Sequence, residues 1–272
     1  MRKLGINYTS ATGLTPRESL PLIRKAGFDS LFTMYKADPA LMDDFADAAA
    51  RSGLEWESIH APFRNEISIN SLWLPGEAGD WALCALLRCV DTCAAHGVRV
   101  MVVHLSSGDE APCVSNIGRQ RLDALVDRAV QRGVTLGFEN QRKLANLAFV
   151  FELYENVPQV GFCWDIGHET CFAGGREYMP LFGNRLVYTH IHDNLCQKDG
   201  DLHMIPFDGA IDFGRRVELL RRFNYQGSLT LELHPGKCGK YNSLSHQEYF
   251  ARAYAAAARL RAMLDGDQPE GE

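Results

Sequence analysis

The sequence alternates along almost its whole length between short β-rich segments and helical segments. We predict strands at residues 4–8, 28–34, 55–60, 98–104, 133–139, 159–165, 185–191 and 227–233. We predict helices at residues 16–26, 38–52, 79–96, 116–131, 146–155, 174–182, 212–223 and 246–264. Such an alternation favours parallel strands covered by helices, and eight units in about 250 residues match the size of a closed β/α barrel.

The predicted fold class is therefore α/β, a single (β/α)8 TIM barrel over residues 1–264, followed by a disordered tail at 265–272. The runner-up fold is a doubly wound open sheet, which would place a glycine-rich phosphate loop after its first strand. The segment YTSATG at residues 8–13 is not such a loop. The sequence therefore favours the barrel.

Composition narrows the class of protein. Hydrophobic residues make up 46% of the chain, and the formal net charge of −6 gives no sign of a polyanionic partner. The first residues lack the apolar stretch of a signal peptide, and no apolar run reaches the length of a membrane span. We expect a cytoplasmic protein without a membrane partner, whose eight cysteines stay as thiols.

Six of the eight predicted strands end in a histidine or an acidic residue. These residues are His60, His104, Glu139, Asp165, His190 and Glu232. Catalytic groups of β/α barrels lie at the carboxyl ends of the strands, so we expect the six side chains to share one rim. A single strand-end histidine or glutamate is most often a packed residue, a cap or an ion-pair partner, but six such coincidences on one rim are improbable.

Strand parity indicates which way these side chains point. Within residues 133–139, Glu139 shares its face with small or polar residues, and the opposite face is apolar. The same pattern places Glu232 and Asp165 on the inner faces of their strands. Several carboxylates around one axis would repel one another unless a cation neutralised them. We therefore predict a metal group of Glu139, Asp165, His190 and Glu232, which suits Mn²⁺, Co²⁺, Mg²⁺ or Zn²⁺ without selecting among them.

Further candidates lie beyond the strands. His168, Asp201 and His203 form a plausible tridentate set for a second or third metal; otherwise His168 and His203 would bind substrate hydroxyls or a phosphate. We expect Asp193 to orient His190 from behind, and we assign no metal to His192.

Several motifs resemble those of the xylose-isomerase-like barrel superfamily. They are HAPF at 60–63, VVHLSSG at 102–108, FEN at 138–140, DIGH at 165–168, HIHD at 190–193, the segment from Asp201 to Phe213, and LELHP at 231–235. The resemblance extends from the third predicted strand to the eighth, about two-thirds of the chain. That superfamily includes sugar and sugar-phosphate isomerases and epimerases, and also metal-dependent apurinic endonucleases.

The resemblance to the ketose epimerases implies one metal, held by Glu139, Asp165, His190 and Glu232. It also implies that Glu139 and Glu232 act as acid and base, one removing a carbon-bound proton and the other returning it on the opposite face. Those epimerases carry an arginine in the loop after the seventh strand, where this chain has Asp201 and His203. This departure leaves the exact reaction open.

The resemblance to the endonucleases implies a three-zinc cluster. Its nine ligands would be His60, His104, Glu139, Asp165, His168, His190, Asp201, His203 and Glu232. The segments HAPFRNE and ENQRK lack the continuations typical of the DNA enzymes. The basic residues expected near the rim are scattered and would equally suit one sugar phosphate, namely Arg64, Arg142, Lys143, Lys198, Lys237 and Lys240. We therefore do not expect a nucleic-acid partner.

The leading hypothesis is a divalent-metal-dependent isomerase or epimerase, or a related lyase. It would act on a small sugar, sugar phosphate or keto-polyol through an enediolate. The alternatives are an apurinic-site endonuclease with a multinuclear zinc cluster and a non-catalytic carbohydrate-binding barrel. In the helix predicted at 79–96, the hydrophobic residues cover more than the single stripe needed to face the core, which hints at a homo-oligomer.

Overall fold

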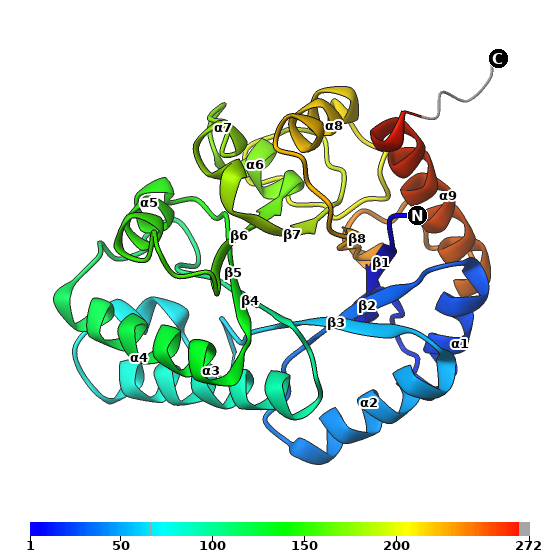
Figure 1. The fold of residues 1–272 in the computed structure, drawn as a ribbon. Helices are drawn as coiled ribbons and strands as arrows, with labels where there is room; N and C mark the ends of the chain where they lie inside the picture. Colours follow the sequence, from blue (N-terminus) through cyan, green and yellow to red (C-terminus); the bar gives the residue numbers. More distant parts are fainter. Residues whose placement is uncertain (66, 267–272) are drawn as a thin grey trace.

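The computed structural model describes residues 1–65 and 67–266, and eight parallel strands form its centre. The strands are β1 Leu4–Asn7, β2 Ser30–Met34, β3 Glu55–His60, β4 Val100–Val103, β5 Thr135–Glu139, β6 Val160–Asp165, β7 Leu186–His190 and β8 Leu229–Leu231. Their order is β7-β6-β5-β4-β3-β2-β1-β8. Backbone hydrogen bonds from Ile191 to Thr230 and from Glu232 to Ile191 join the two outermost strands and close the ring. The predicted barrel is confirmed (Figure 1).

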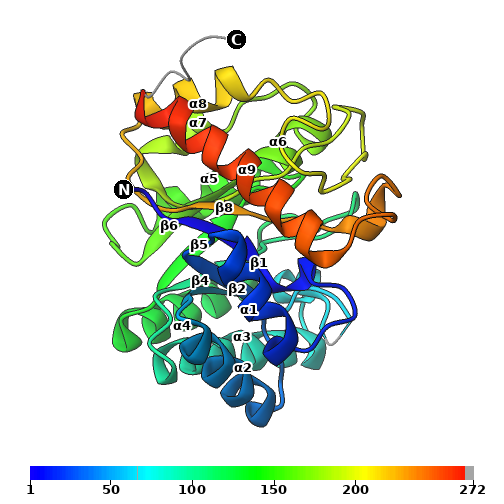
Figure 2. The same cartoon turned by 90° about the vertical axis from the view of Figure 1, so that its right-hand side faces the viewer.

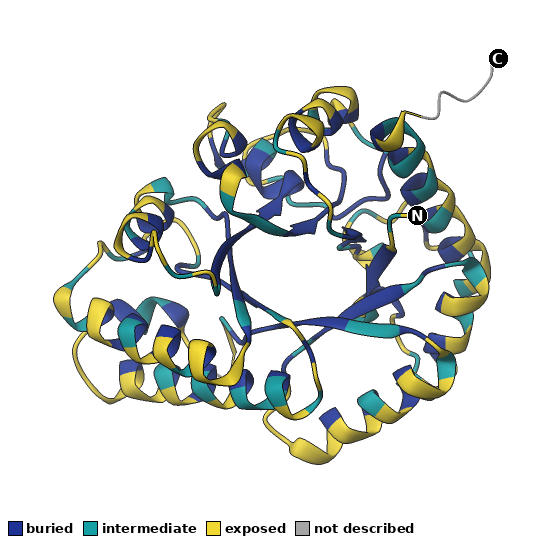
Figure 3. Ribbon diagram, in the orientation of Figure 1, coloured by how far each residue is buried: buried dark blue, intermediate teal, exposed yellow. Residues whose placement is uncertain are grey.

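Helices surround the strands. They are α1 Pro16–Ala26, α2 Pro39–Ser52, α3 Glu77–Ala95, α4 Asn116–Arg132, α5 Leu144–Leu153, α6 Ile166–Phe172, α7 Met179–Phe182, α8 Phe213–Arg222 and α9 His246–Asp265. The last helix runs beside α1 and covers β1 and β8, so the two ends of the chain complete one wall (Figure 2). Figure 3 shows buried strands inside a ring of helices whose outer faces are exposed. None of the helices in the described residues is long and apolar enough to cross a membrane.

The helix predicted at 174–182 differs from the structure. A helix, α6, starts directly after β6, because the carboxylate of Asp165 caps it by accepting a hydrogen bond from the His168 amide at 2.6 Å. Gly174 and Gly175 both have positive φ and separate α6 from the short α7. The predicted strand ends at Asp165 and a loop is expected to follow it, whereas Asp165 is also the N-cap of α6.

The C-terminal boundary shifts by one residue. Helix α9 includes Asp265, and Gly266 ends it in the left-handed conformation. Residues 267–272 of the predicted tail lie outside the described residues. On α3, the side chain of Trp81 is 55% exposed, and the homo-oligomer stays a prediction. Each of the eight cysteines is a free thiol, as expected.

Most of the apolar core lies between the strands and the helices, where it forms one continuous cluster. Inside the barrel, a smaller cluster of Val102, Cys163 and Tyr188 fills the centre. Below it, the buried Glu57 accepts hydrogen bonds from Ser30 at 2.9 Å and from Ser228 at 2.7 Å. The lumen is thus packed, and its open end is the rim at the carboxyl ends of the strands.

Candidate metal centre

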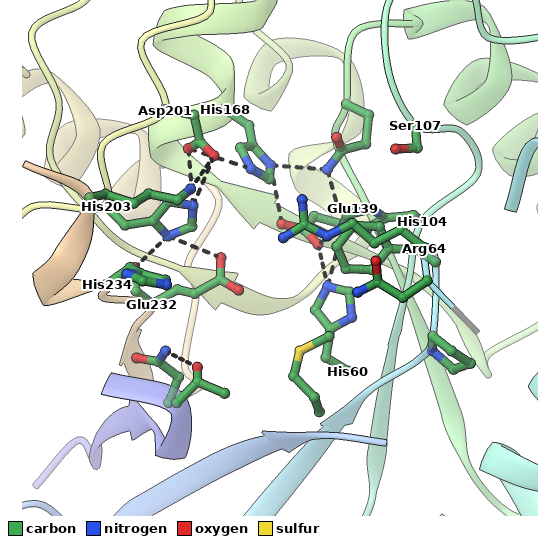
Figure 4. A pocket seen from close by; sticks show the side chains of 18 of the residues that line it. His60, Arg64, His104, Ser107, Glu139, His168, Asp201, His203, Glu232 and His234 are labelled. Atoms are coloured by element: carbon green, nitrogen blue, oxygen red, sulfur yellow. Dashed lines mark hydrogen bonds and ion pairs between the residues drawn. The ribbon is translucent and has the colours of Figure 1, made fainter. Parts of the chain in front are cut away.

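A pocket of about 490 Å³ opens at this rim. Strands β3, β5, β6 and β7 end at His60, Glu139, Asp165 and His190 as predicted. His104 and Glu232 each lie one residue beyond the end of their strand, so each is the first residue of the loop that follows. His60 and Glu139 lie on one side of the pocket, and Asp201, His203 and Glu232 lie on the other (Figure 4).

The buried carboxylate of Glu139 lies at the centre of the site. Its Oε2 atom is 2.7 Å from His104 Nε2 and 3.2 Å from His60 Nε2. Its Oε1 atom is 3.2 Å from Nδ1 of both His190 and His168. One carboxylate therefore faces four imidazoles, two on each oxygen.

The predicted four-residue group is assembled around His190. The ligand atoms of Glu139, Asp165, His190 and Glu232 all lie within 4.8 Å of one another. Nδ1 of His190 is 3.5 Å from Glu232 Oε2, and the imidazole stacks on Phe32 with a centroid distance of 4.6 Å. The group combines three carboxylates with one imidazole and could hold a divalent metal ion.

A second group contains His60, His104 and Glu139, whose ligand atoms also lie within 4.8 Å of one another. Both histidines are buried. Because Glu139 belongs to both groups, the two lie side by side.

The third group contains the predicted His168, Asp201 and His203 and also His192, to which sequence analysis assigned no metal. Nε2 of His192 is 3.1 Å from Asp165 Oδ1, and the ring stacks on His203 with a centroid distance of 3.9 Å. His192 is two residues after His190 and so points inward with it. That parity is the signal by which the sequence could have identified it.

Asp193 has a different role from the predicted one. Its carboxylate accepts hydrogen bonds from the backbone amides of Asn194, Gly209 and Ile211. It thereby holds together the long loop that carries Asp201 and His203, and no hydrogen bond joins it to His190 within the described part of the chain. Sequence proximity to His190 had suggested direct support, but strand alternation turns Asp193 away from the axis.

The charges at the site respond to burial and to one another. Burial opposes ionisation of Glu139, yet the facing His104 and His190 hold the pKa of its carboxyl well below the ordinary value. Burial also opposes protonation of the histidines, but Asp165 and Glu139 raise the pKa of His168 to about 10, and Glu232 and Glu139 raise the pKa of His190 to about 9. The raised pKa values of His168 and His190 thus reflect the negative charge that the carboxylates concentrate at this rim.

The donor set fits divalent cations. Several buried polar atoms have no hydrogen-bond partner among the described residues, namely His104 Nδ1, Asp165 Oδ2, His190 Nε2 and His192 Nδ1. Buried polar atoms are rarely left unpaired, and carboxylate oxygens and imidazole nitrogens are ligands of Mn²⁺, Co²⁺ and Zn²⁺. All nine sequence-predicted residues thus lie in three adjoining groups that could hold metal ions.

Comparison with known proteins identifies the family and the fold. The chain is similar to the uncharacterized protein y4fM of Sinorhizobium fredii, with 29% identity over 91% of this chain and 89% of that protein. Its fold is similar to that of an L-ribulose 3-epimerase (20% identity, TM-score 0.75, all of both chains covered). It is also similar to that of the 3-keto-D-glucoside 4-epimerase of E. coli (17% identity, TM-score 0.73, 96% of this chain and all of that one). A model of one protein family matches residues 20–259. The chain belongs to the xylose isomerase-like TIM barrel family.

Proposed function

We propose that this protein is a divalent-metal-dependent isomerase or epimerase that acts on a small sugar, sugar phosphate or keto-polyol through an enediolate. The observation that carries the proposal is the pair of carboxylates around His190. Nδ1 of His190 lies 3.2 Å from Glu139 Oε1 and 3.5 Å from Glu232 Oε2, and both glutamates line the pocket. The epimerase activity of proteins with the same fold supports this assignment.

Glu139, Asp165, His190 and Glu232 would hold the catalytic cation. A divalent cation bound there would polarise a substrate carbonyl and stabilise negative charge on the adjacent oxygens. His104 and His190 face Glu139 and hold the pKa of its carboxyl well below the ordinary value, so its carboxylate can accept a proton from carbon. Glu232 has a partly exposed side chain on the opposite wall and is placed to return a proton on the other face.

The side chains around the two glutamates would orient the substrate. His168 and His203 line the pocket beside them, and their ring nitrogens can hydrogen-bond to hydroxyl groups. Asp201 lies 3.0 Å from His203 Nε2 and sets the orientation of that ring. If the third group holds a metal instead, the same residues would become ligands.

The apurinic-site endonuclease is the second candidate. The three adjoining ligand groups favour it, because a multinuclear cluster suits phosphodiester hydrolysis. Metal analysis of protein purified without added metal separates the two, with about one equivalent expected for the isomerase and about three for the cluster. The third candidate, a carbohydrate-binding barrel, would bind sugars without reacting with them.

Proton exchange tests the reaction class directly. Incubation of the Mn²⁺-loaded protein in heavy water with a panel of ketoses and keto-polyols should introduce deuterium at the carbon next to the carbonyl. Glu232→Gln should reduce the exchange by more than ~100-fold, the usual contribution of a lost acid or base. Cleavage of an abasic duplex without exchange on any sugar would overturn the proposal in favour of the endonuclease.

A further inference from the structure

Some of the cations that line the pocket are already neutralised. Nε of Arg142 lies 2.8 Å from Asp109, and its Nη2 lies 3.0 Å from Asp199. Nζ of Lys237 lies 2.8 Å from Asp201 Oδ2. These side chains stabilise the loops around the site, so they are poorly placed to give up a partner for a ligand.

Arg64 and Lys36 differ from these two cations. Both line the pocket and are exposed, and neither has an ion-pair partner among residues 1–65 and 67–266. Figure 4 shows the guanidinium of Arg64 reaching from the wall that carries His60 toward Glu139 and His168. A cation directed into an acidic pocket without being paired there is available to a ligand.

The guanidinium of Arg64 lies beside the candidate metal centre, 5.1 Å from the ring centroid of Phe63. That ring packs on His104 and His60, with centroid distances of 4.3 Å and 5.3 Å. The contact with this packed ring restricts where the guanidinium lies, which reduces the entropy lost when it binds a ligand.

We propose that Arg64, assisted by Lys36, binds an anionic group of the substrate, so that the substrate is an anionic polyhydroxy carbonyl compound. This inference rests on the proposed isomerase or epimerase function. A guanidinium matches both phosphate and carboxylate through two parallel hydrogen bonds. An anionic substrate also needs such a cation, because the carboxylates that line the same pocket would otherwise repel it.

Paired substrates test the proposal. Exchange in heavy water is compared between D-ribulose and D-ribulose 5-phosphate for a phosphate, and between D-fructose and D-fructuronate for a carboxylate. The wild-type protein should prefer one charged compound over its neutral partner. Arg64→Gln should lower kcat/KM for that compound about 10- to 100-fold more than for the neutral partner, as expected for a lost hydrogen bond between charged groups. Arg64→Lys should retain part of the preference.

Arg88→Gln is the matched control, because Arg88 is also exposed, lies 4.9 Å over the ring of Trp81 and does not line the pocket. It removes the same charge and should leave the preference intact. A wild-type protein that exchanges neutral sugars at least as well as charged ones would overturn the inference and leave the proposed function standing. So would an equal loss for both substrates in Arg64→Gln.

A different result would contradict the proposed function, namely no exchange on any of the four compounds. Binding of D-ribulose 5-phosphate, measured by calorimetry on the Mn²⁺-loaded protein, then decides the role of Arg64. Weaker binding by Arg64→Gln than by Arg88→Gln supports an anion site. Equal binding by the two variants overturns it.

Discussion

Gly167, the glycine of DIGH, touches the imidazole of His192. A Cβ atom on Gly167 would lie 1.9 Å from His192 Cε1 and 2.3 Å from each ring nitrogen. The imidazole cannot move away from an added methyl group, because it is fully buried and stacks on His203 with a centroid distance of 3.9 Å. We therefore expect Gly167→Ala to displace His192 and to disturb the ligand group that contains it.

The cost of this overpacking follows from the contact distances. Forcing one methyl group into a packed core costs about 1–3 kcal/mol. For a chain of this size each kcal/mol lowers the melting temperature by roughly 2–4 °C, so a cost of about 2 kcal/mol corresponds to roughly 4–8 °C. Gly137→Ala is the control, since its Cβ would lie 3.4 Å from its nearest neighbour, an ordinary contact.

Thermal unfolding followed by circular dichroism measures the loss of stability, and elemental analysis measures the metal content of each variant. Gly167→Ala should unfold at a lower temperature than Gly137→Ala and should retain less metal. The double variant Gly167→Ala/His192→Ala should regain stability relative to Gly167→Ala, because the clash is removed. Equal melting temperatures and metal contents in Gly167→Ala and Gly137→Ala would refute the assigned contact.

Three further predictions concern the centre and its support. Glu139→Gln should lower kcat for exchange by more than ~100-fold, the usual contribution of a lost acid or base. Glu152→Gln, on the exposed face of α5, is the control and should leave kcat unchanged. A near-normal kcat in Glu139→Gln would exclude Glu139 as the base. Because the pKa of His190 is about 9 without metal, Mn²⁺ must displace its proton, so affinity should rise as the pH increases toward 9. Calorimetry in buffers of different ionisation enthalpy detects this proton release, and a pH-independent affinity would contradict it. Arg216→Met should cost about 3–5 kcal/mol in urea unfolding, since it removes the cation 2.8 Å from the buried Glu169. A loss no greater than that of Arg215→Met, whose exposed pair is the control, would disprove this role.

Much of the fold could be predicted from local patterns. The eightfold alternation identified the barrel, and strand parity placed Glu139 on the pocket side of β5. These predictions succeed because helix and strand periodicities are local, and because barrel topology brings the carboxyl ends of all strands to one rim. The error at DIGH arose because Asp165 serves both as the last residue of β6 and as the N-cap of α6.

His192 and Asp193 show where local patterns stop being sufficient. Both belong to HIHD, yet one enters a ligand group and the other holds a loop through three backbone amides. The difference depends on how the loop after β7, with Asp201 and Gly209, folds back onto these two residues. No short-range pattern records those contacts.

The sequence by itself determined the fold class and the residue types at the rim, because both follow from short-range periodicity and from the ends of the strands. Only the tertiary structure decided how those residues divide into three adjoining groups. It also decided that Glu139 is shared between two of them and that Arg64 reaches into the pocket without an ion-pair partner among the described residues. The physical reason is that distances between side chains from different strands depend on how the barrel closes and how its loops fold back, which is a property of the whole chain.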